Sequence, residues 1–428
     1  MHTTKSAEKI TPFGGLNFCL KSFHDSGLAS LIDRHLGRRV QTVGFSYSDI
    51  IANQLAIFLA GGDCAEDLNE HLRGPASHIK KLSVCSADTL LRGVKQMACD
   101  SQELVHPTSG VKHTFNINEP LNDLLVKALR LTGQLSSGAR YDLDYDNQVI
   151  PTEKWDAAPT YKKYYGYQPG IASIDNLPVY IEGRNGNSQA TFEQAATLSR
   201  MFALLKANQV SIGRFRADSG SYLQDAVEVV EANTEQFYIR ARRSAEMDRQ
   251  IGQVPDEAWS SIRLGWQKMD VAEIRWTPFG GESSYRLIVS RIKRSDHQGD
   301  LFSGGAYTWR AILTNDHKST PKQIVAFYNK RGGSERVFDV MNNDFGWSKL
   351  PCSFLSENTA YMILTAIIAN FYRYIIGLYS QRISWLKATW RLKKFIFRFI
   401  TVPAKWIRSG RQNILKLYTH KDYQLLLE

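Results

Sequence analysis

The segment that most constrains the fold is residues 140–150, with the sequence RYDLDYDNQVI. Asp142, Asp144 and Asp146 alternate with aromatic or aliphatic residues, and this period of two predicts a β-strand with all three acids on one face. Carboxylates on one face repel each other and are costly to bury unless cations neutralise them. The pattern therefore predicts an exposed acidic strand end or a metal site, with a plain acidic turn as the alternative.

A second acid stands at the end of another predicted strand. Residues 210–218, VSIGRFRAD, favour a strand that ends at Asp218, and Ser219 and Gly220 then lead into a helix. In open α/β sheets, ligands bind beyond the carboxyl ends of the strands. Asp218 is therefore a candidate site residue, although Asp-Ser-Gly is also a common turn.

A third acid lies in residues 320–344, TPKQIVAFYNKRGGSERVFDVMNND, which predict a helix because apolar residues recur about every 3.6 positions. Tyr328, Arg331 and Glu335 fall on one face of that helix, which suits phosphate and metal. The alternative is a set of solvated polar positions. The glycine pair between Arg331 and Glu335 favours a break, since glycine costs about 1 kcal/mol relative to alanine inside a helix.

Carboxylates at the adjacent ends of strands and a helix are what two-metal phosphoryl transfer requires. Distance along the chain does not prevent Asp144, Asp218 and Glu335 from meeting in the fold. The long interval between Asp218 and Glu335 has room for an inserted β-rich segment. Its predicted strands carry arginines beside Trp276 and Trp309.

The charge balance favours a polyanionic partner. The chain of 428 residues has a net charge of +11, and binding to phosphates releases condensed counterions. No acidic residue occurs between Glu357 and Asp422, where aromatic residues accompany many cations. This basic segment is typical of a nucleic-acid face or an anionic membrane face, and equally of a solvated basic helix on a core.

Other features limit the class of protein. The five cysteines show no close pairing and predict reduced thiols in a cytosolic protein, and the ten histidines show no zinc-ligand spacing. The first twenty residues lack an apolar stretch long enough for a signal peptide. Residues 360–379 are the most apolar stretch, but Asn370 and Arg373 interrupt it, so a helix buried in protein is favoured over a membrane span.

The N-terminal part predicts several short helices up to about Asp100. In the last of these, Ser86 can cap the helix, and Thr89, Arg92 and Lys95 share one face, as in the second helix of a helix-turn-helix. A helical bundle without a DNA-reading role fits the same pattern.

Taken together, these motifs resemble the DDE transposases of bacterial insertion sequences. The matching sequence motifs are YDLDYD for the first acid, FRADSG for the second, and YNKRGGSE for the third. The third motif carries a Tyr-Arg-Glu signature. The last two motifs resemble the insertion-sequence family numbered 1380 in particular. The resemblance implies an α/β fold with an RNase-H-like core, interrupted by a β-rich insertion and flanked by a helical N-terminal region and a helical basic C-terminal tail.

The implied domains are a helical DNA-binding region at 1–132, core segments at 138–243 and 318–380, the β-rich insertion at 244–317 and the basic tail at 381–428. The resemblance makes Asp144, Asp218 and Glu335 ligands of two Mg²⁺ ions, for which Mn²⁺ can substitute. It also implies that Tyr328, Lys330 and Arg331 contact DNA.

Two departures from the family pattern bear on these assignments. Relatives often carry a lysine where this chain has Asn342, so one DNA contact is absent or replaced. Relatives also commonly have a Ser-Thr pair after the first catalytic aspartate, whereas Tyr145 and Asp146 follow Asp144. Asp142 therefore stays open as the first ligand beside Asp144.

The resemblance implies cut-and-paste transposition. Water attacks the phosphodiester at the element end, and the released 3′ hydroxyl attacks a second phosphodiester. Trp276 or Trp309 would stack on a flipped base if a DNA hairpin forms. The N-terminal helices, with Arg92 and Lys95, would read terminal inverted repeats, and the tail would hold flanking or target DNA.

The expected assembly is a homodimer on double-stranded DNA in the bacterial cytoplasm, at the nucleoid, with no membrane partner. Two other functions fit the same residues. One is an RNase-H-like nuclease that cuts without joining, and the other is a catalytically inactive DNA-binding protein.

Overall fold

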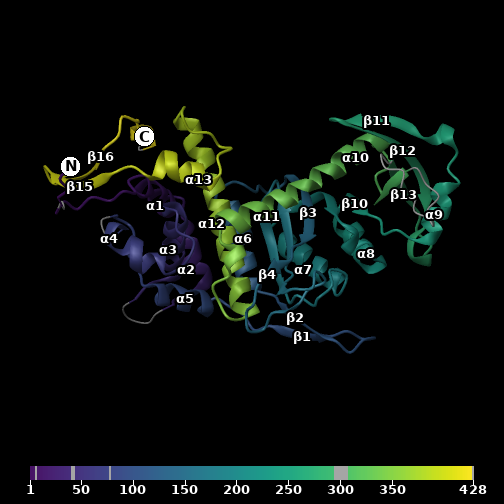
Figure 1. Cartoon of the computed structure of the whole chain (residues 1–428), viewed down its shortest axis with the longest axis horizontal. Helices are drawn as coiled ribbons and strands as arrows, with labels where there is room; N and C mark the ends of the chain where they lie inside the picture. Colours follow the sequence, from purple (N-terminus) through teal and green to yellow (C-terminus); the bar gives the residue numbers. More distant parts are fainter. Residues whose placement is uncertain (5–6, 40–43, 77–78, 294–306, 427–428) are drawn as a thin grey trace.

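The computed structural model describes residues 1–4, 7–39, 44–76, 79–293 and 307–426. It is a mixed α/β structure in which helices cover a large mixed sheet (Figure 1). The helices are α1 Leu16–Asp25, α2 Leu28–Leu36, α3 Tyr47–Ala60, α4 Arg73–Ala76, α5 Ala87–Gln96, α6 Glu119–Leu131, α7 Gln194–Ala207, α8 Gln224–Asn233, α9 Ala245–Gly252, α10 Pro321–Asn329, α11 Gly333–Asp344, α12 Leu355–Arg382 and α13 Leu392–Phe395.

The strands form one large sheet and two small ones. The large sheet has the order β1-β2-β8-β7-β3-β9-β10-β14-β13-β12-β11. Its strands are β1 Gln102–Val105, β2 Lys112–Asn116, β3 Arg140–Asn147, β7 Gly170–Ile174, β8 Leu177–Arg184, β9 Ser211–Ala217, β10 Gln236–Arg240, β11 Ser260–Leu264, β12 Gln267–Trp276, β13 Tyr285–Lys293 and β14 Tyr307–Thr314. The small sheets contain β4 Ile150–Pro151, β5 Ala158–Pro159 and β6 Tyr165–Tyr167, and β15 Ala404–Ser409 with β16 Gln412–Leu417.

The centre of the large sheet is parallel, and this sets the position of the acids. β3 pairs in parallel with β9, and β9 with β10, so the three strands end at the same edge. The alternating segment around the three aspartates is the strand β3, as its period predicts. Strands β11 to β14 continue the sheet beyond β10 through antiparallel pairs. Residues 294–306 of the expected insertion lie outside the described residues.

The helix α12 is the central support of the molecule. It stands between the N-terminal helices and the sheet (Figure 1), and most of its residues are buried. It is long and apolar enough to cross a membrane, but 78% of its most apolar window is buried within the protein. Asn370, which interrupts the apolar pattern, donates a hydrogen bond to the carbonyl of Pro178 on β8. This burial agrees with the expected core helix.

The N-terminal region holds the expected helices but also two strands. Ser86 caps α5 as expected, since its hydroxyl accepts a hydrogen bond from the amide of Thr89. The region expected to be helical at 1–132 also contains β1 and β2, which form a hairpin joined to β8. The burial of β2 alternates at its start, and Gly110 takes the positive φ of 66° that the connecting turn requires.

The expectation of a helical C-terminal tail was also wrong for most of its length. In the described part of 381–428, the helical residues are the end of α12, α13, a short helical turn after it and a 3₁₀ turn at Gln424–Leu426, whereas β15 and β16 form an antiparallel hairpin. Gly410 and Arg411 at its tip both have positive φ, of 52° and 67°, as a two-residue hairpin turn requires. The hairpin pairs with the start of the chain through the bridge between Thr11 and Ala404. The helices α1 to α5, α13 and this hairpin are called the terminal lobe below.

The expected helix at 320–344 forms with a change of winding at its centre. α10 begins with a capping box between Thr320 and Gln323, with Pro321 in its first turn. A 3₁₀ turn over Lys330–Gly332 then leads directly into α11. The glycine pair therefore tightens the helix without ending it, so the face shared by Tyr328, Arg331 and Glu335 is approximately kept.

Candidate active site

Two of the three aspartates on β3 are neutralised by arginines of β9. In the parallel register, Asp142 lies opposite Arg214 and Asp144 opposite Arg216. Each carboxylate receives two hydrogen bonds from its arginine, with donor–acceptor distances of 2.6 Å for Asp142 and of 2.6 and 2.8 Å for Asp144. The ring of Phe327 on α10 covers both guanidinium groups at 4.0 and 4.4 Å. These pairs remove the repulsion expected of three acids on one face.

The same ladder ends differently at the edge of the sheet. Tyr145 and Ala217 are the last residues that pair between β3 and β9. Asp146 follows Tyr145 in the sequence, and Asp218 follows Ala217. The residue opposite Asp146 is therefore a second acid, Asp218, whereas Asp142 and Asp144 each face an arginine of β9. Burial raises the pKa of Asp146 to about 6, the charge of Asp218 adds to the increase, and Arg331 opposes it. Two acids are thus close together at the carboxyl ends of parallel strands.

The helix α10 and its 3₁₀ turn hold a tyrosine and an arginine over this acid pair. The hydroxyl of Tyr328 donates to the carbonyl of Ala217, the residue before Asp218, at 3.2 Å. Arg331 donates to the carboxylate of Asp146 at 2.8 Å, and both side chains of this pair are mostly buried. The sequence grouped Tyr328 and Arg331 with the acids, and the structure brings them together.

Glu335 lies one helical turn beyond Arg331, in the first turn of α11. It is exposed, and within the described part of the chain it has no hydrogen-bond or ion-pair partner. Within the described residues, the structure therefore shows no contact between Glu335 and the acid pair.

The structure favours a different first acid from the one that the sequence favoured. Asp144 is buried in its bidentate pair with Arg216, and Asp142 is in the equivalent pair with Arg214, so two hydrogen bonds from an arginine already neutralise each carboxylate. Asp146, which the sequence names only as one of the three acids of the strand, lies beside Asp218 and receives a single hydrogen bond from Arg331. Parallel pairing of the two strands is the signal that could have identified Asp146. In a parallel pair, the last acid of one strand lies beside the acid that follows the end of the other strand.

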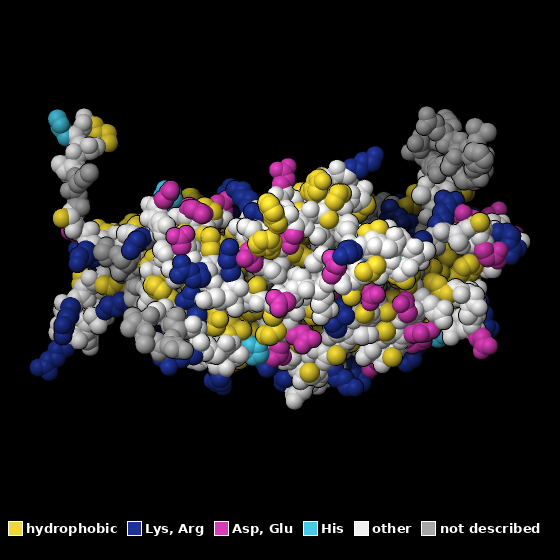
Figure 2. Space-filling model, turned by 90° about the horizontal axis from the view of Figure 1, so that it is seen from below, with side chains coloured by type: hydrophobic (Ala, Val, Ile, Leu, Met, Phe, Trp, Pro, Cys, Tyr) yellow, Lys and Arg dark blue, Asp and Glu magenta, His cyan; other side chains and the backbone are white. Residues whose placement is uncertain are grey.

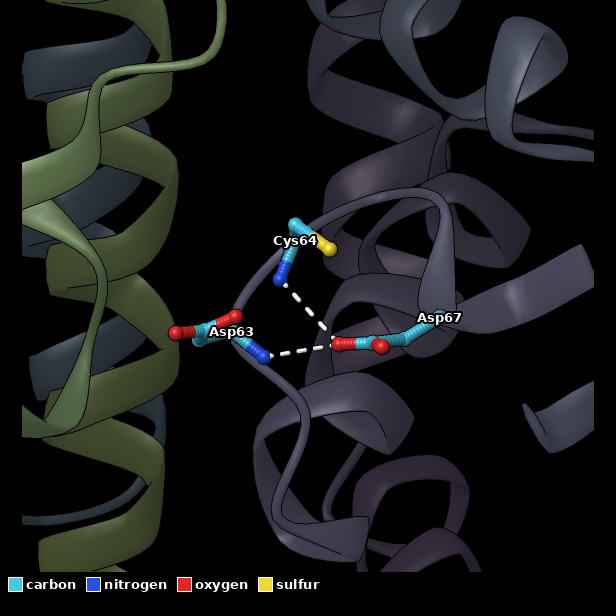
Figure 3. A group of neighbouring side chains, drawn as sticks. All are labelled: Asp63, Cys64 and Asp67. Carbon is cyan, nitrogen blue, oxygen red and sulfur yellow. Dashed lines mark hydrogen bonds between the residues drawn. The ribbon is translucent and has the colours of Figure 1, made fainter. Parts of the chain in front are cut away.

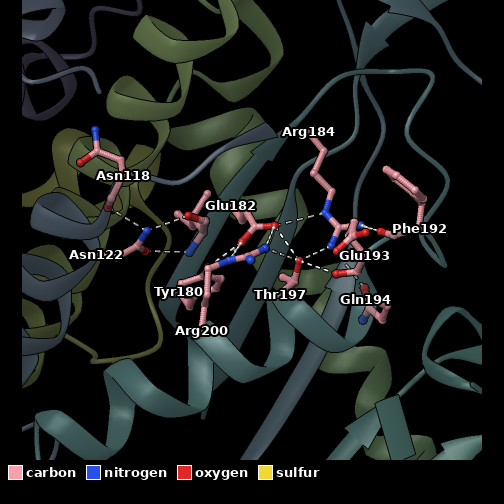
Figure 4. Close-up of polar contacts among 11 residues, drawn as sticks. Asn118, Asn122, Tyr180, Glu182, Arg184, Phe192, Glu193, Gln194, Thr197 and Arg200 are labelled. Carbon is pink, nitrogen blue, oxygen red and sulfur yellow. Dashed lines mark hydrogen bonds and ion pairs between the residues drawn. The ribbon is translucent and has the colours of Figure 1, made fainter. Parts of the chain in front are cut away.

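A buried polar network is centred on Glu182 and Arg184 of β8 (Figure 4). Glu182 on β8 is fully buried and accepts hydrogen bonds from Tyr180, Thr197 and Arg200. Arg184, also fully buried, donates to the carbonyl of Phe192 and to Gln194.

Gln194 connects this network to the candidate site. Its amide donates to the hydroxyl of Ser221 at 2.9 Å, and the amide of Ser221 donates to the carbonyl of Asp218 at 3.3 Å. Asp218 itself accepts from the amide of Gly220 at 2.8 Å. The network therefore fixes the short turn that presents Asp218.

The remaining predicted DNA-binding residues lie in different places. Lys330 is exposed beside Arg331, and Arg92 and Lys95 are exposed on α5, where Lys95 is 3.5 Å from Glu357. Trp309 is partly buried under Arg243, whose guanidinium is 5.1 Å from the ring. Trp276 is 7% exposed, and its indole N–H donates to the hydroxyl of Tyr222, so it cannot stack on a base without leaving the core.

Asp63, Cys64 and Asp67 form a second acidic group, in the loop after α3 (Figure 3). Their ligand atoms lie within 4.8 Å of one another. However, the carboxylate of Asp67 already accepts hydrogen bonds from the amides of Asp63 and Cys64, and Asp63 is paired with Lys349 at 2.6 Å. The group is explained by its own loop and carries no function here.

The fold and the paired acids define a mixed α/β protein with a carboxylate centre at the edge of its sheet. Residues 6–428 match the model of the family described as transposase DDE domain group 1, so the chain belongs to this family and is a DDE transposase. The resemblance to DDE transposases is confirmed, whereas the assignment to the insertion-sequence family numbered 1380 stays a prediction. DDE transposases generally use divalent metal ions.

Among solved structures, the chain is similar to the piggyBac transposase in a cryo-EM structure of its synaptic complex with hairpin DNA. The TM-score is 0.45 and the sequence identity 14%, over 90% of this chain and 79% of that chain. The comparison with curated proteins gives no match.

Proposed function

We propose that this transposase cuts DNA at the ends of a mobile element and joins the released 3′ ends to a target. The observation that carries the proposal is the break in the Asp–Arg ladder. β9 neutralises two aspartates of β3 with arginine and then places Asp218 beside Asp146. A pair of carboxylates at the carboxyl edge of a sheet is unfavourable without a cation, and it suits a divalent metal.

The residues present fit Mg²⁺ or Mn²⁺. Oxygen ligands are what these ions prefer, and Asp146, Asp218 and Glu335 would supply them. The raised pKa of Asp146 reflects burial next to a second acid, which a bound cation relieves. Two such ions, when bound, polarise the phosphodiester and lower the pKa of water.

The protein side chains around the acids position the substrate. Arg331 neutralises Asp146 in this structure, and its guanidinium would hold a phosphate if a cation bound that carboxylate instead. Tyr328 fixes the helix over the end of β9, and the exposed Lys330 extends the positive surface beside it. Glu335, exposed one turn later, completes the ligand set by turning towards the pair.

The strand order supports an RNase-H-like core. β8, β7, β3, β9 and β10 follow one another in the sheet, and of these five strands β7 alone runs against the others. Strands β11 to β14 fall between Asp218 and Glu335 in the sequence, as expected of an inserted β-rich segment.

If a DNA hairpin forms, Trp266 is better placed than Trp276 or Trp309 to stack on a flipped base. It stands at the tip of the β11–β12 hairpin, with its side chain fully exposed. Arg263 and Lys268 face each other across the same hairpin, and this pair of like charges suits a polyanion. The apolar face of the hairpin packs against α10, which carries Tyr328.

The test is cutting and joining of a plasmid-borne element end with Mg²⁺ or Mn²⁺. Asp146→Asn and Asp218→Asn should each lower cutting at least about a hundredfold, the scale of a lost electrostatic contact to the transition state, while DNA binding is retained. Asp142→Asn, an aspartate of the same strand face, is the matched control and should cut normally. Loss of cutting in Asp142→Asn but not in Asp146→Asn would contradict the assignment.

The second candidate function is a nuclease that cuts without joining, because the same carboxylate site serves both reactions. Cutting that never yields joined products under either metal would favour it. Binding without any cutting would favour a DNA-binding protein with structural acids.

A further inference from the structure

The terminal lobe contains a groove that the catalytic site does not use. A hollow of about 810 Å³ lies between α1, the β15–β16 hairpin and the last described residues. A second hollow, of about 570 Å³, shares Lys80, Lys81 and Trp406 with it, and a third, of about 360 Å³, shares Lys421 and Asp422. The three hollows are therefore neighbours, and together they are called the terminal groove below.

The terminal groove is strongly basic. Its cationic lining consists of Lys9, Lys21, Lys80, Lys81, Arg398 and Lys421, against Asp49 and Asp422. Lys21 and Lys81 are paired with Asp25, whereas Lys80, Arg398 and Lys421 have no carboxylate partner among the described residues. Both aspartates accept hydrogen bonds from backbone amides near them in the sequence, of Ser46 and Gln424 respectively. On the face drawn in Figure 2, the left end of the molecule, which belongs to the terminal lobe, carries mostly Lys and Arg, while Asp and Glu gather over the middle and right.

Two lysines of the groove lie on aromatic rings. The ammonium of Lys80 lies 4.6 Å from the ring centre of Trp406, whose indole N–H is anchored on Asn17 at 3.1 Å. The ammonium of Lys421 lies 4.7 Å from the ring of Trp385 and donates to the carbonyl of Arg398. Burial and the neighbouring Arg398 lower the pKa of Lys421, as expected where cations are crowded together.

The shape and the charge of the groove select its occupant. A recessed row of ammonium groups over aromatic rings matches a strand of phosphates with sugars and bases, which can enter a hollow. A flat lipid surface needs a protruding apolar face instead. The groove also lies on the other side of α12 from β3, the strand that carries Asp146 (Figure 1), so it is separate from the acid pair.

We propose that the terminal groove binds the sugar–phosphate backbone of DNA at a second site, separate from the acid edge of the sheet. The inference rests on the proposal that the chain acts on DNA, but it needs no catalytic step. Lys80 and Lys421 make the phosphate contacts, and Trp406 and Trp385 hold their ammonium groups in place.

The experiment measures binding of a fluorescent DNA duplex by anisotropy at several salt concentrations. It uses the full chain with the Asp218→Asn substitution, so that cutting does not interfere. Removing two phosphate contacts with Lys80→Ala and Lys421→Ala should lower the slope of log affinity against log salt by about two, since each contact contributes about 0.9. The matched control is Lys162→Ala with Lys206→Ala, which removes the same charge from two exposed lysines outside the groove, of which Lys162 also lies over an aromatic ring.

The outcomes separate the two proposals. An equal slope in the groove and control variants, or a protein that binds no duplex at all, would overturn the second site. Loss of binding to anionic vesicles in the groove variant, with DNA binding unchanged, would overturn it in favour of a membrane. If the slope falls as expected while the unsubstituted protein never cuts DNA, the groove stands and the proposed cutting reaction fails.

Discussion

The acid edge of the sheet and the terminal groove use positive charge in opposite ways. At the acid edge, Arg214, Arg216 and Arg331 are each paired with an aspartate of β3. In the terminal groove, Lys80 and Lys421 lie over tryptophan rings with a carbonyl as the only other partner described for them. The three arginines stabilise the fold and shape a site, whereas Lys80 and Lys421 are available to an anion from outside.

The largest expected effect is on stability, and it comes from breaking the buried ion pair between Asp144 and Arg216. Arg216→Met leaves the carboxylate of Asp144 buried without a partner, which should cost about 3 to 5 kcal/mol in the free energy of unfolding. Urea unfolding measures this loss. Arg214→Met, in the more exposed equivalent pair, should cost about 1 kcal/mol or less. An equal loss of unfolding free energy in the two variants would show that burial does not make the Asp144–Arg216 pair more important than the Asp142–Arg214 pair.

The next effect concerns the network behind Asp218. Gln194→Ala removes the hydrogen bond to Ser221 and loosens the turn that presents Asp218. The Mn²⁺ concentration needed for half-maximal cutting should rise by about 10- to 100-fold, as for other groups that orient a metal ligand, with DNA affinity unchanged. Gln194→Glu keeps the shape and should restore part of the effect. A fall in cutting with no change in metal dependence would mean a purely structural role.

The smallest expected effect on stability is at the hairpin tip. Trp266→Ala removes a fully exposed side chain, so the free energy of unfolding should change by about 0.5 kcal/mol or less. Under the proposal that Trp266 stacks on a base, affinity for a duplex with an unpaired base at its end should fall by about 1 to 3 kcal/mol. Trp309→Ala is the control variant. An equal loss of DNA affinity in Trp309→Ala would contradict the proposal that Trp266 stacks on the base.

The sequence predicted the helices and strands better than it predicted which of their residues lie side by side. The period of β3, the strand ending at Asp218 and the capped helix at Thr320 all follow from local rules, and the structure contains each of them. The choice among three aspartates depended on which strand lies beside β3 and in what register, which no local pattern states. The hairpin at β15–β16 was missed because its cations and aromatic residues were taken as a helical face.

The most direct test of the central claim is Mn²⁺ binding, measured by electron paramagnetic resonance, in the presence of a short DNA duplex. Asp146→Asn and Asp218→Asn should each lose bound Mn²⁺, and Asp142→Asn should retain it, with thermal unfolding confirming that all three variants fold. Retention of Mn²⁺ by Asp146→Asn together with its loss in Asp142→Asn would contradict the assignment of the acid pair.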